Sequence, residues 1–145
     1  MTLLIVGGTE AVSPMGMNKA GNQRAGDGLS TVVAPITDWT ERSGYPDSVI
    51  GGSGLIARQA GQVMVYWGLN VTVSTTVTST FELMLNDDSL QSLPIDDDGV
   101  VTSQLNSPLS LTPGDELWMR VTVPPTWTST YVLDGPDTYI YFEAA

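Results

Sequence analysis

The 145-residue sequence has no cysteine and no histidine, and it carries only five lysine and arginine residues against 16 aspartate and glutamate residues. Without cysteine there is no disulfide framework. Without either residue type the chain lacks the usual ligands of a zinc, copper or iron site. The absence of histidine also removes the Ser-His-Asp and Cys-His nucleophile schemes. These absences exclude the commonest hydrolytic and metal-dependent functions.

Long apolar runs are absent as well, so the sequence predicts no membrane-spanning helix. The run Leu3-Leu4-Ile5-Val6 is too short for a secretion signal and has no basic flank, which favours synthesis in the cytoplasm. The net charge is −11, and residues 61–145 hold eleven acids against the single base Arg120. Such a body repels phosphate backbones and anionic lipids. We therefore expect neither nucleic acid nor membrane as a partner.

The remaining chemistry rests on carboxylates. A carboxylate pair for glycoside hydrolysis stays open, but sixteen acids supply many accidental pairs. The glycine-rich run at residues 51–54 is not followed by Lys-Ser/Thr, so it is no phosphate loop. Hard oxygen ligands for calcium occur on two turns, at Asp87, Asp88, Asp96, Asp97 and Asp98. Their spacing differs from that of a helix–loop–helix calcium loop. We therefore interpret these residues first as solvated acids on turns, and second as ligands of a calcium site shared between subunits. We predict no enzyme and no cofactor.

Two stretches carry the strongest structural signal. In residues 62–74 every second residue from Val63 to Val73 is apolar, which is the period of a half-buried β-strand. In residues 138–143 the residues Tyr139, Ile140, Tyr141 and Phe142 are large and apolar on both strand faces. Such a strand needs cover on both sides, from its own core and from another subunit. The pattern indicates a β-module that assembles.

Further short segments rich in valine and threonine alternate with Gly, Pro, Asn and Asp turns, and none has a convincing helical period. This predicts an all-β antiparallel sandwich over residues 36–145. Residues 1–35 are loose in composition after the first few residues. We expect them to form an extended N-terminal arm, with a locally packed part of the domain as the alternative.

The order of these signals resembles the jelly roll of the complement globular-head and tumour-necrosis-factor superfamily, and also small virion proteins of tailed phages. The resemblance covers about residues 39–145. It is carried by an ordered set of segments: Trp39, the motif SGYP at 43–46, LIA at 55–57, AGQVMV at 60–65, FELMLN at 81–86, LSLTPGDEL at 109–117 and TYIYF at 138–142.

This resemblance implies an antiparallel jelly-roll β-sandwich that forms a homotrimer with aromatic side chains at its centre. We expect Tyr139, Tyr141, Phe142 and Trp118 at the trimer interface. The phage likeness implies a decoration protein that cements the outside of a capsid where capsomers meet, with the major capsid protein as partner and the virion surface as location. Capsid attachment is then expected of Leu3, Leu4, Ile5 and Val6.

Two other functions stay open. The first is a minor tail or fibre-tip module that contacts a host glycan or protein through an exposed tryptophan, Trp118 or Trp127. Trp118 lies on the polar phase of its strand, whereas Trp67 lies on the apolar phase and is expected in the core. The second is a carboxylate-based glycan hydrolase.

Overall fold

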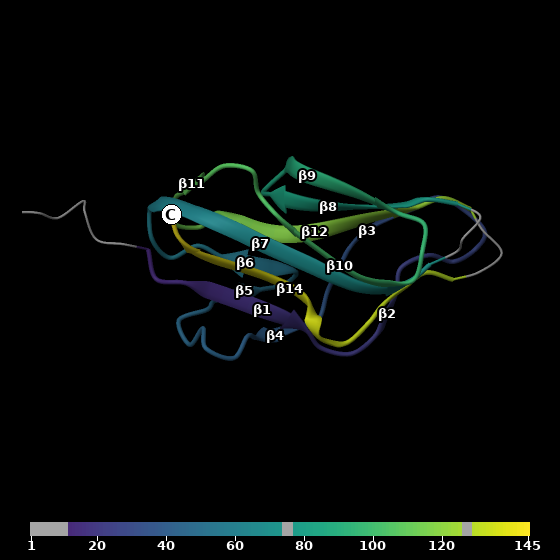
Figure 1. Ribbon diagram of the computed structural model, residues 1–145, viewed down its shortest axis with the longest axis horizontal. Coiled ribbons are helices and arrows are strands. Elements are labelled where there is room, and N and C mark those ends of the chain that lie inside the picture. Colours follow the sequence, from purple (N-terminus) through teal and green to yellow (C-terminus); the bar gives the residue numbers. More distant parts are fainter. Residues whose placement is uncertain (1–11, 74–76, 126–128) are drawn as a thin grey trace, which may run out of the picture.

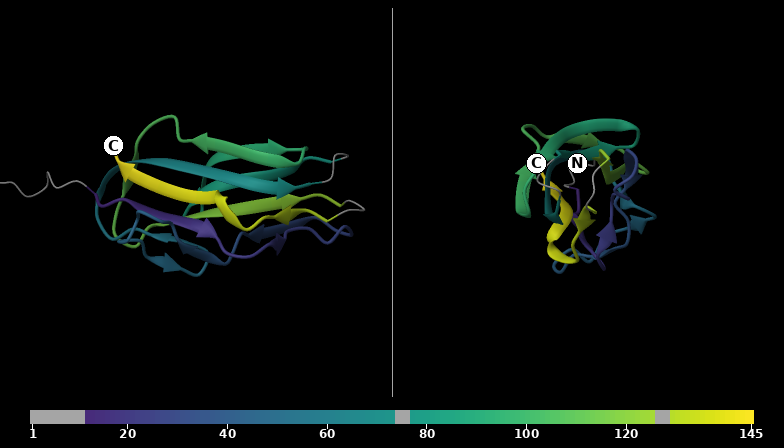
Figure 2. Two further views of the ribbon diagram at one scale, coloured as in Figure 1. Left: turned by 60° about the horizontal axis from the view of Figure 1, so that its bottom comes forward. Right: turned by 90° about the vertical axis from the view of Figure 1, so that its right-hand side faces the viewer.

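The computed structural model describes residues 12–73, 77–125 and 129–145. Within these ranges the regular elements are all β-strands, arranged in two antiparallel sheets that pack face to face (Figure 1). Figure 2 shows that the sandwich is elongated along the strand direction. The expected all-β antiparallel sandwich is confirmed.

Sheet A, the eight-stranded sheet, contains the long strand predicted at residues 62–74 and the closing strand. Its strands in spatial order are β2 (Gln23–Arg24), β13 (Tyr131–Val132), β7 (Gly61–Thr72), β14 (Gly135–Ala144), β1 (Met15–Lys19) and β4 (Trp39–Glu41). Two further strands pair with β7, namely β10 (Gly99–Gln104) and β11 (Leu109–Leu111). The closing strand β14 lies between β7 and β1, so it is central in the sheet.

Sheet B, the six-stranded sheet, covers the inner face of sheet A. Its strands in order are β5 (Ile50–Gly51), β6 (Gly54–Ile56), β12 (Glu116–Val123), β8 (Ser79–Leu85) and β9 (Asp88–Ile95), and β3 (Val32–Pro35) also pairs with β12. Turns separate these strands. The turn predicted at residues 86–89 is shorter in the structure, where residues 86–87 join β8 to β9, and β12 ends at Val123 before Pro124-Pro125. Proline has no N–H for a further ladder bond, which is why the strand ends there.

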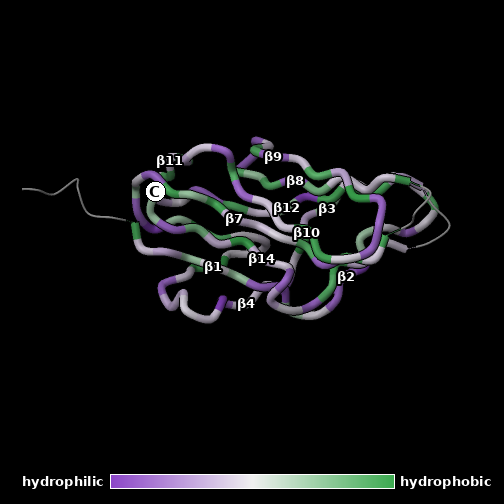
Figure 3. Tube along the Cα trace, in the orientation of Figure 1, coloured by the Kyte–Doolittle hydropathy of each residue, from purple (hydrophilic) through white to green (hydrophobic). Residues whose placement is uncertain are grey.

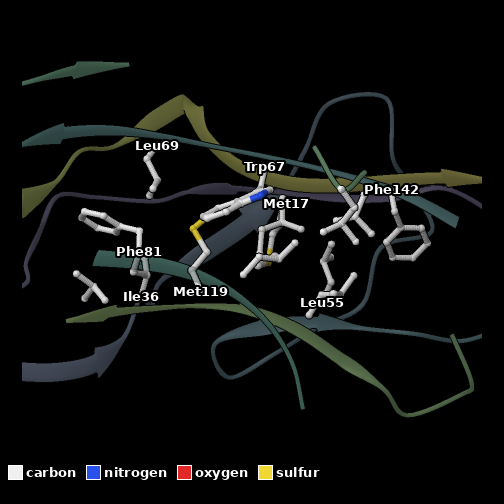
Figure 4. Packing of buried hydrophobic residues seen from close by; sticks show 14 of the residues in the cluster. Met17, Ile36, Leu55, Trp67, Leu69, Phe81, Met119 and Phe142 are labelled. Atoms are coloured by element: carbon white, nitrogen blue, oxygen red, sulfur yellow. The ribbon is translucent and has the colours of Figure 1, made fainter. Parts of the chain in front are cut away.

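The hydrophobic core lies between the two sheets (Figure 4). Because side chains alternate across a strand, β7 sends Val63, Val65, Trp67 and Leu69 inward, and each is fully buried. Trp67, predicted to be core, packs beside Met119 in Figure 4. Figure 3 shows the resulting alternation of hydrophobic and hydrophilic residues along the strands.

The described part of the expected N-terminal arm belongs to the sandwich, which corrects the boundary at residue 35. Strand β1 pairs with both β14 and β4, and its Met15 and Met17 are 2% and 0% exposed. Burying two methionines offsets the entropy of ordering this strand, and a loose composition alone does not reveal that pairing. Residues Leu3, Leu4, Ile5 and Val6 lie outside the described residues.

Candidate functional site

Four tyrosines gather on the outward face of sheet A. They are Tyr45, Tyr66, Tyr139 and Tyr141, and with Arg42 they are called the tyrosine face below. In the pairing of β14 with β7, Tyr141 lies opposite Tyr66 and Tyr139 lies opposite Gly68. All four tyrosines are half-buried in the single chain. The alternation that sends Ile140 and Phe142 into the core therefore turns Tyr139 and Tyr141 outward.

The rings of the tyrosine face are in mutual contact. The ring centroids of Tyr66 and Tyr141 are 4.8 Å apart with an interplanar angle of 15°, and those of Tyr139 and Tyr141 are 5.5 Å apart. Tyr45 adds a tilted ring whose centroid lies 5.4 Å from that of Tyr141. Aromatic pairs at these separations contribute about 0.5–1.5 kcal/mol each beyond area burial. The face is thus a preformed aromatic platform.

Glycine at position 68 makes room for the platform. A Cβ atom added to Gly68 would lie 2.5 Å from a ring carbon of Tyr139, closer than real Cβ contacts allow. The Tyr139 ring therefore lies flat over the backbone of β7. Any side chain at position 68 would displace the ring outward and change the shape of the face.

Arg42 caps the platform with a positive charge. Its guanidinium carbon lies 4.5 Å from the ring centroid of Tyr139 and 5.0 Å from that of Tyr141, which is cation–π geometry. Its Nη1 donates to Asn18 Oδ1 at 2.7 Å and to the Pro136 carbonyl at 3.1 Å. These bonds hold the guanidinium in one place against the rings.

Burial raises the pKa of three of these phenols. The pKa of Tyr45 is raised to about 12, first by desolvation and then by the hydrogen bond that its hydroxyl donates to Glu143 Oε1 at 3.0 Å. Desolvation is also the main reason that the pKa values of Tyr139 and Tyr141 are raised. These shifts favour the neutral form of Tyr45, Tyr139 and Tyr141 still further, so the three phenols offer an uncharged aromatic surface.

The structure separates the four residues expected at the trimer interface. Tyr139 and Tyr141 lie side by side on the tyrosine face. Phe142 is 1% exposed within the single chain, so its own core covers it and the assignment to an interface is corrected. Trp118 lies on β12 of sheet B, on the opposite side of the sandwich from the tyrosines. A period-two pattern fixes which residues share a face, but it does not say which face of β14 is the inner one.

Sequence reasoning missed Tyr66, Tyr45 and Arg42 as members of this face. Tyr66 was visible as a large aromatic on the polar phase of the strand at residues 62–74. Tyr45 and Arg42 gave no such signal, because they come from the loop after β4 and reach the face only through tertiary contacts. Trp127 lies outside the described residues.

The described carboxylates do not gather into a metal centre. Among residues 12–73, 77–125 and 129–145 no group of three potential ligands is close enough to hold an ion. Asp98 Oδ1 accepts a hydrogen bond from the backbone N–H of Val73, and Asp97 Oδ1 accepts one from the N–H of Asp98. These side chains thus take part in the turn before β10.

No protein-family model and no curated protein sequence matches the chain. Among solved structures it is similar to the Eiger TNF of S. frugiperda, at 19% identity over 94% of each chain with a TM-score of 0.66. It is also similar to murine APRIL, at 13% identity over 92% of this chain and 98% of the other with a TM-score of 0.64. Rabbit GITRL has 17% identity over 78% and 93%, with a TM-score of 0.52. The expected jelly roll is thereby confirmed: the chain has the fold of the tumour-necrosis-factor family.

Proposed function

We propose that this chain is a non-enzymatic structural protein that forms a homotrimer through its tyrosine face. We further propose that the trimer decorates the outside of a tailed-phage capsid, where it binds the major capsid protein at the boundaries between capsomers. The observation that carries the self-association is the aromatic platform on the outward face of sheet A. The capsid role rests on the resemblance to small virion proteins.

Several properties of the tyrosine face support an interface between copies. The rings are neutral, preorganised by stacking and fixed by Arg42, so little side-chain entropy remains to be lost on association. Tyrosine and arginine are the residue types that dominate the energetics of protein interfaces. The tumour-necrosis-factor-like fold supports the same arrangement, because that resemblance implies trimers with aromatic side chains at the centre.

The composition also supports a role without catalysis, because the chain has no histidine and no cysteine. Among the residues that the structure describes, no helix is long and apolar enough to cross a membrane. When three copies are linked, weak contacts of each copy with a repeating lattice act together and raise the overall affinity. Such avidity suits a cementing protein.

The trimer is tested by native mass from light scattering after size exclusion. The wild type is expected at about three times the chain mass of 15.4 kDa. The double variant Tyr66→Ser, Tyr141→Ser is expected at the mass of one chain. As a matched control, Val33→Ser removes an apolar side chain that is 59% exposed on sheet B and should leave the mass unchanged. A monomeric wild type, or a trimeric double variant, contradicts the assignment.

The capsid role is tested separately, with undecorated capsids of a tailed phage and the trimer in a co-sedimentation assay. Deletion of residues 1–11, which removes Leu3, Leu4, Ile5 and Val6, is expected to abolish capsid binding while the trimer mass scales with the shortened chain. A truncated trimer that still saturates capsids would contradict the attachment assignment. Failure of the full chain to bind any capsid would contradict decoration but not trimerisation.

A further inference from the structure

A groove of about 350 Å³ opens on the outward face of sheet B, on the side opposite the tyrosine face. It lies where β3, β6 and β12 meet. The residues that matter in its lining are Val33, Pro35, Ser53, Glu116, Trp118 and Arg120. Its size falls in the range of small-molecule sites. It combines an apolar wall with three different polar groups.

Trp118 presents carbon surface to this groove. Its neighbour across the strand pair on β6 is Gly54, so no side chain on β6 covers the indole from that side. A Cβ atom at Gly54 would lie 2.5 Å from the Leu117 carbonyl oxygen and close to Glu116, so glycine is required there. The indole Nε1–H donates to the Asn86 carbonyl at 2.8 Å. The ring is therefore held in one orientation with its polar atom already satisfied.

The polar groups beside Trp118 are held in place. Arg120 donates from Nε and Nη2 to Glu82 Oε1, at 3.1 and 2.8 Å. Asn86 accepts from the Glu116 N–H at 3.0 Å and so fixes the backbone beneath the Glu116 side chain. Ser53 adds a hydroxyl at the rim. A guanidinium, a carboxylate and a hydroxyl around one aromatic ring provide donors and acceptors in several directions.

An extended peptide is a poor fit to the same groove. The outer edge of β3 is the place where a strand would add, but Pro35 has no N–H to offer. The Pro35 carbonyl accepts from Gln23 Nε2 at 3.0 Å, and Gln23 Oε1 in turn accepts from the Thr37 N–H at 2.8 Å. The Gln23 amide thus occupies this edge, which leaves recognition to side chains.

We propose that this groove binds one uncharged pyranose ring of a carbohydrate. The apolar C–H face of the sugar would stack on the Trp118 indole, and its hydroxyls would bond with Arg120, Glu116 and Ser53. Glu116 in the groove and the net charge of −11 select against acidic sugars. All these residues belong to one chain and lie on strands of sheet B or, for Ser53, in the turn between β5 and β6, so the site does not depend on the proposed trimer or on capsid binding.

The experiment is a titration of the full chain, labelled with ¹⁵N, in which the indole N–H resonance of Trp118 is followed. The probes are neutral trisaccharides of glucose, galactose, mannose and N-acetylglucosamine, added one at a time to millimolar concentration, and lactose against sialyllactose as a charge comparison. At least one neutral probe is expected to shift the resonance in a saturable way. Sialyllactose is expected to bind more weakly than lactose.

Four variants, tested by isothermal titration calorimetry, which does not depend on Trp118 as a reporter, locate the site. Trp118→Ala is expected to weaken binding about tenfold or more, whereas Trp118→Phe keeps an aromatic platform and most of the affinity. Val33→Phe, at a 59% exposed position, fills the groove without touching the core and should also abolish binding. Trp39→Phe is the matched control, because Trp39 is another half-buried tryptophan whose Nε1–H donates to a backbone carbonyl. It should bind like wild type.

Three results would overturn the proposal. The first is that no neutral saccharide shifts the Trp118 resonance at millimolar concentration. The second is that folded Val33→Phe, or folded Trp118→Ala, binds as tightly as wild type. The third is that a proline-rich peptide saturates the groove where the saccharides do not. The native mass, measured in parallel, reports on the trimer alone, so the two proposals fail separately.

Discussion

At the scale of single residues, the closing strand shows that two consecutive positions can have different roles, because their side chains point to opposite faces of the sheet. Phe142 is buried, while Tyr141 next to it lies on the tyrosine face. The residue types fit this division, because phenylalanine has no polar atom and tyrosine carries a hydroxyl that needs a partner or water. The hydroxyl of Tyr45 finds that partner in Glu143. We therefore expect the polar groups of single side chains to determine how the stability of the fold changes with pH and with substitution.

Tyr45 is expected to make stability depend on alkaline pH. Its pKa in the folded chain is about 12, above the ordinary value of 10.0, so folding favours the neutral phenol. This stabilisation is complete below pH 10 and is lost as the pH rises through about 12. Ionisation would place a phenolate beside Glu143, with only Arg42 to oppose it. Urea unfolding across this range should show a steeper loss for wild type than for Tyr45→Phe. Equal losses would contradict the assignment.

Gln91 is expected to be the main polar link between the two sheets. Its Oε1 accepts from Trp67 Nε1 at 2.7 Å and from Ser103 Oγ at 2.9 Å, and its Nε2 donates to the Gln104 carbonyl. Gln91→Leu leaves the buried indole N–H without a partner, which should lower the unfolding free energy by about 1–3 kcal/mol. Chemical denaturation measures this change. Ser92→Leu, at the exposed neighbouring position, is the control and should differ little from wild type.

At the scale of elements, β1 shows that pairing rather than composition makes a strand. Its sequence, MGMNK, contains glycine, asparagine and lysine, which are poor strand formers. It is nevertheless ordered, since β14 pairs with it on one side and β4 on the other. The edge of β14 would be open without it, and Phe142 would lose Met15 as its cross-strand neighbour.

Two N-terminal deletions are expected to behave differently. Removing residues 1–11 leaves every described strand in place, so the thermal midpoint should stay close to that of the full chain. Removing residues 1–30 deletes β1 and β2 and two buried methionines, worth about 1.5–3 kcal/mol each. That loss is a large share of the about 5–15 kcal/mol that stabilises an ordinary domain. Calorimetry should show no cooperative transition for the longer deletion. A normal transition would mean that β1 contributes little.

At the scale of the whole molecule, the two sheets place two unlike surfaces on opposite sides. Sheet A carries the tyrosine face outward, and sheet B carries the Trp118 groove outward. Assembly through one face therefore leaves the other accessible. The charge is a property of this scale too, because the proposed trimer would bring together three chains of net charge −11.

Salt is expected to strengthen the proposed trimer. Self-repulsion among three acidic chains opposes assembly, and at physiological ionic strength screening acts over about 8 Å. The tyrosine face is neutral apart from Arg42 and the neighbouring Glu143. Few attractive ion pairs therefore cross the proposed interface, and screening by salt has little attraction between subunits to reduce. Light scattering on a dilution series should give a lower dissociation constant at high salt than at low salt. Dissociation caused by salt would instead indicate ion pairs between subunits and would contradict a mainly aromatic interface.

The sequence determined the local features of this protein. The period of two in β7 predicted both the strand and the burial of Trp67, because alternation along a strand is a property of the backbone itself. The turn residues at 86–89, at 96–99 and at 113–115 likewise predicted breaks between strands, although β9 begins at Asp88 and β10 at Gly99, inside the first two ranges. The absence of cysteine and histidine set the limits on chemistry. The order of the motifs along the chain was enough to predict the jelly roll. Which strands pair with one another could not be predicted from the segments between the motifs.

The tertiary structure decided what depends on residues far apart in the chain. Whether Phe142 or Tyr141 faces the core depends on which side of β14 sheet B covers. Arg42 and Tyr45 join the tyrosine face because β4 pairs with β1, which lies beside β14. Trp118 is separated from the other expected interface residues because β12 belongs to the second sheet. Contacts of this kind form between segments that only strand pairing and the packing of the two sheets bring together, so no local pattern encodes them.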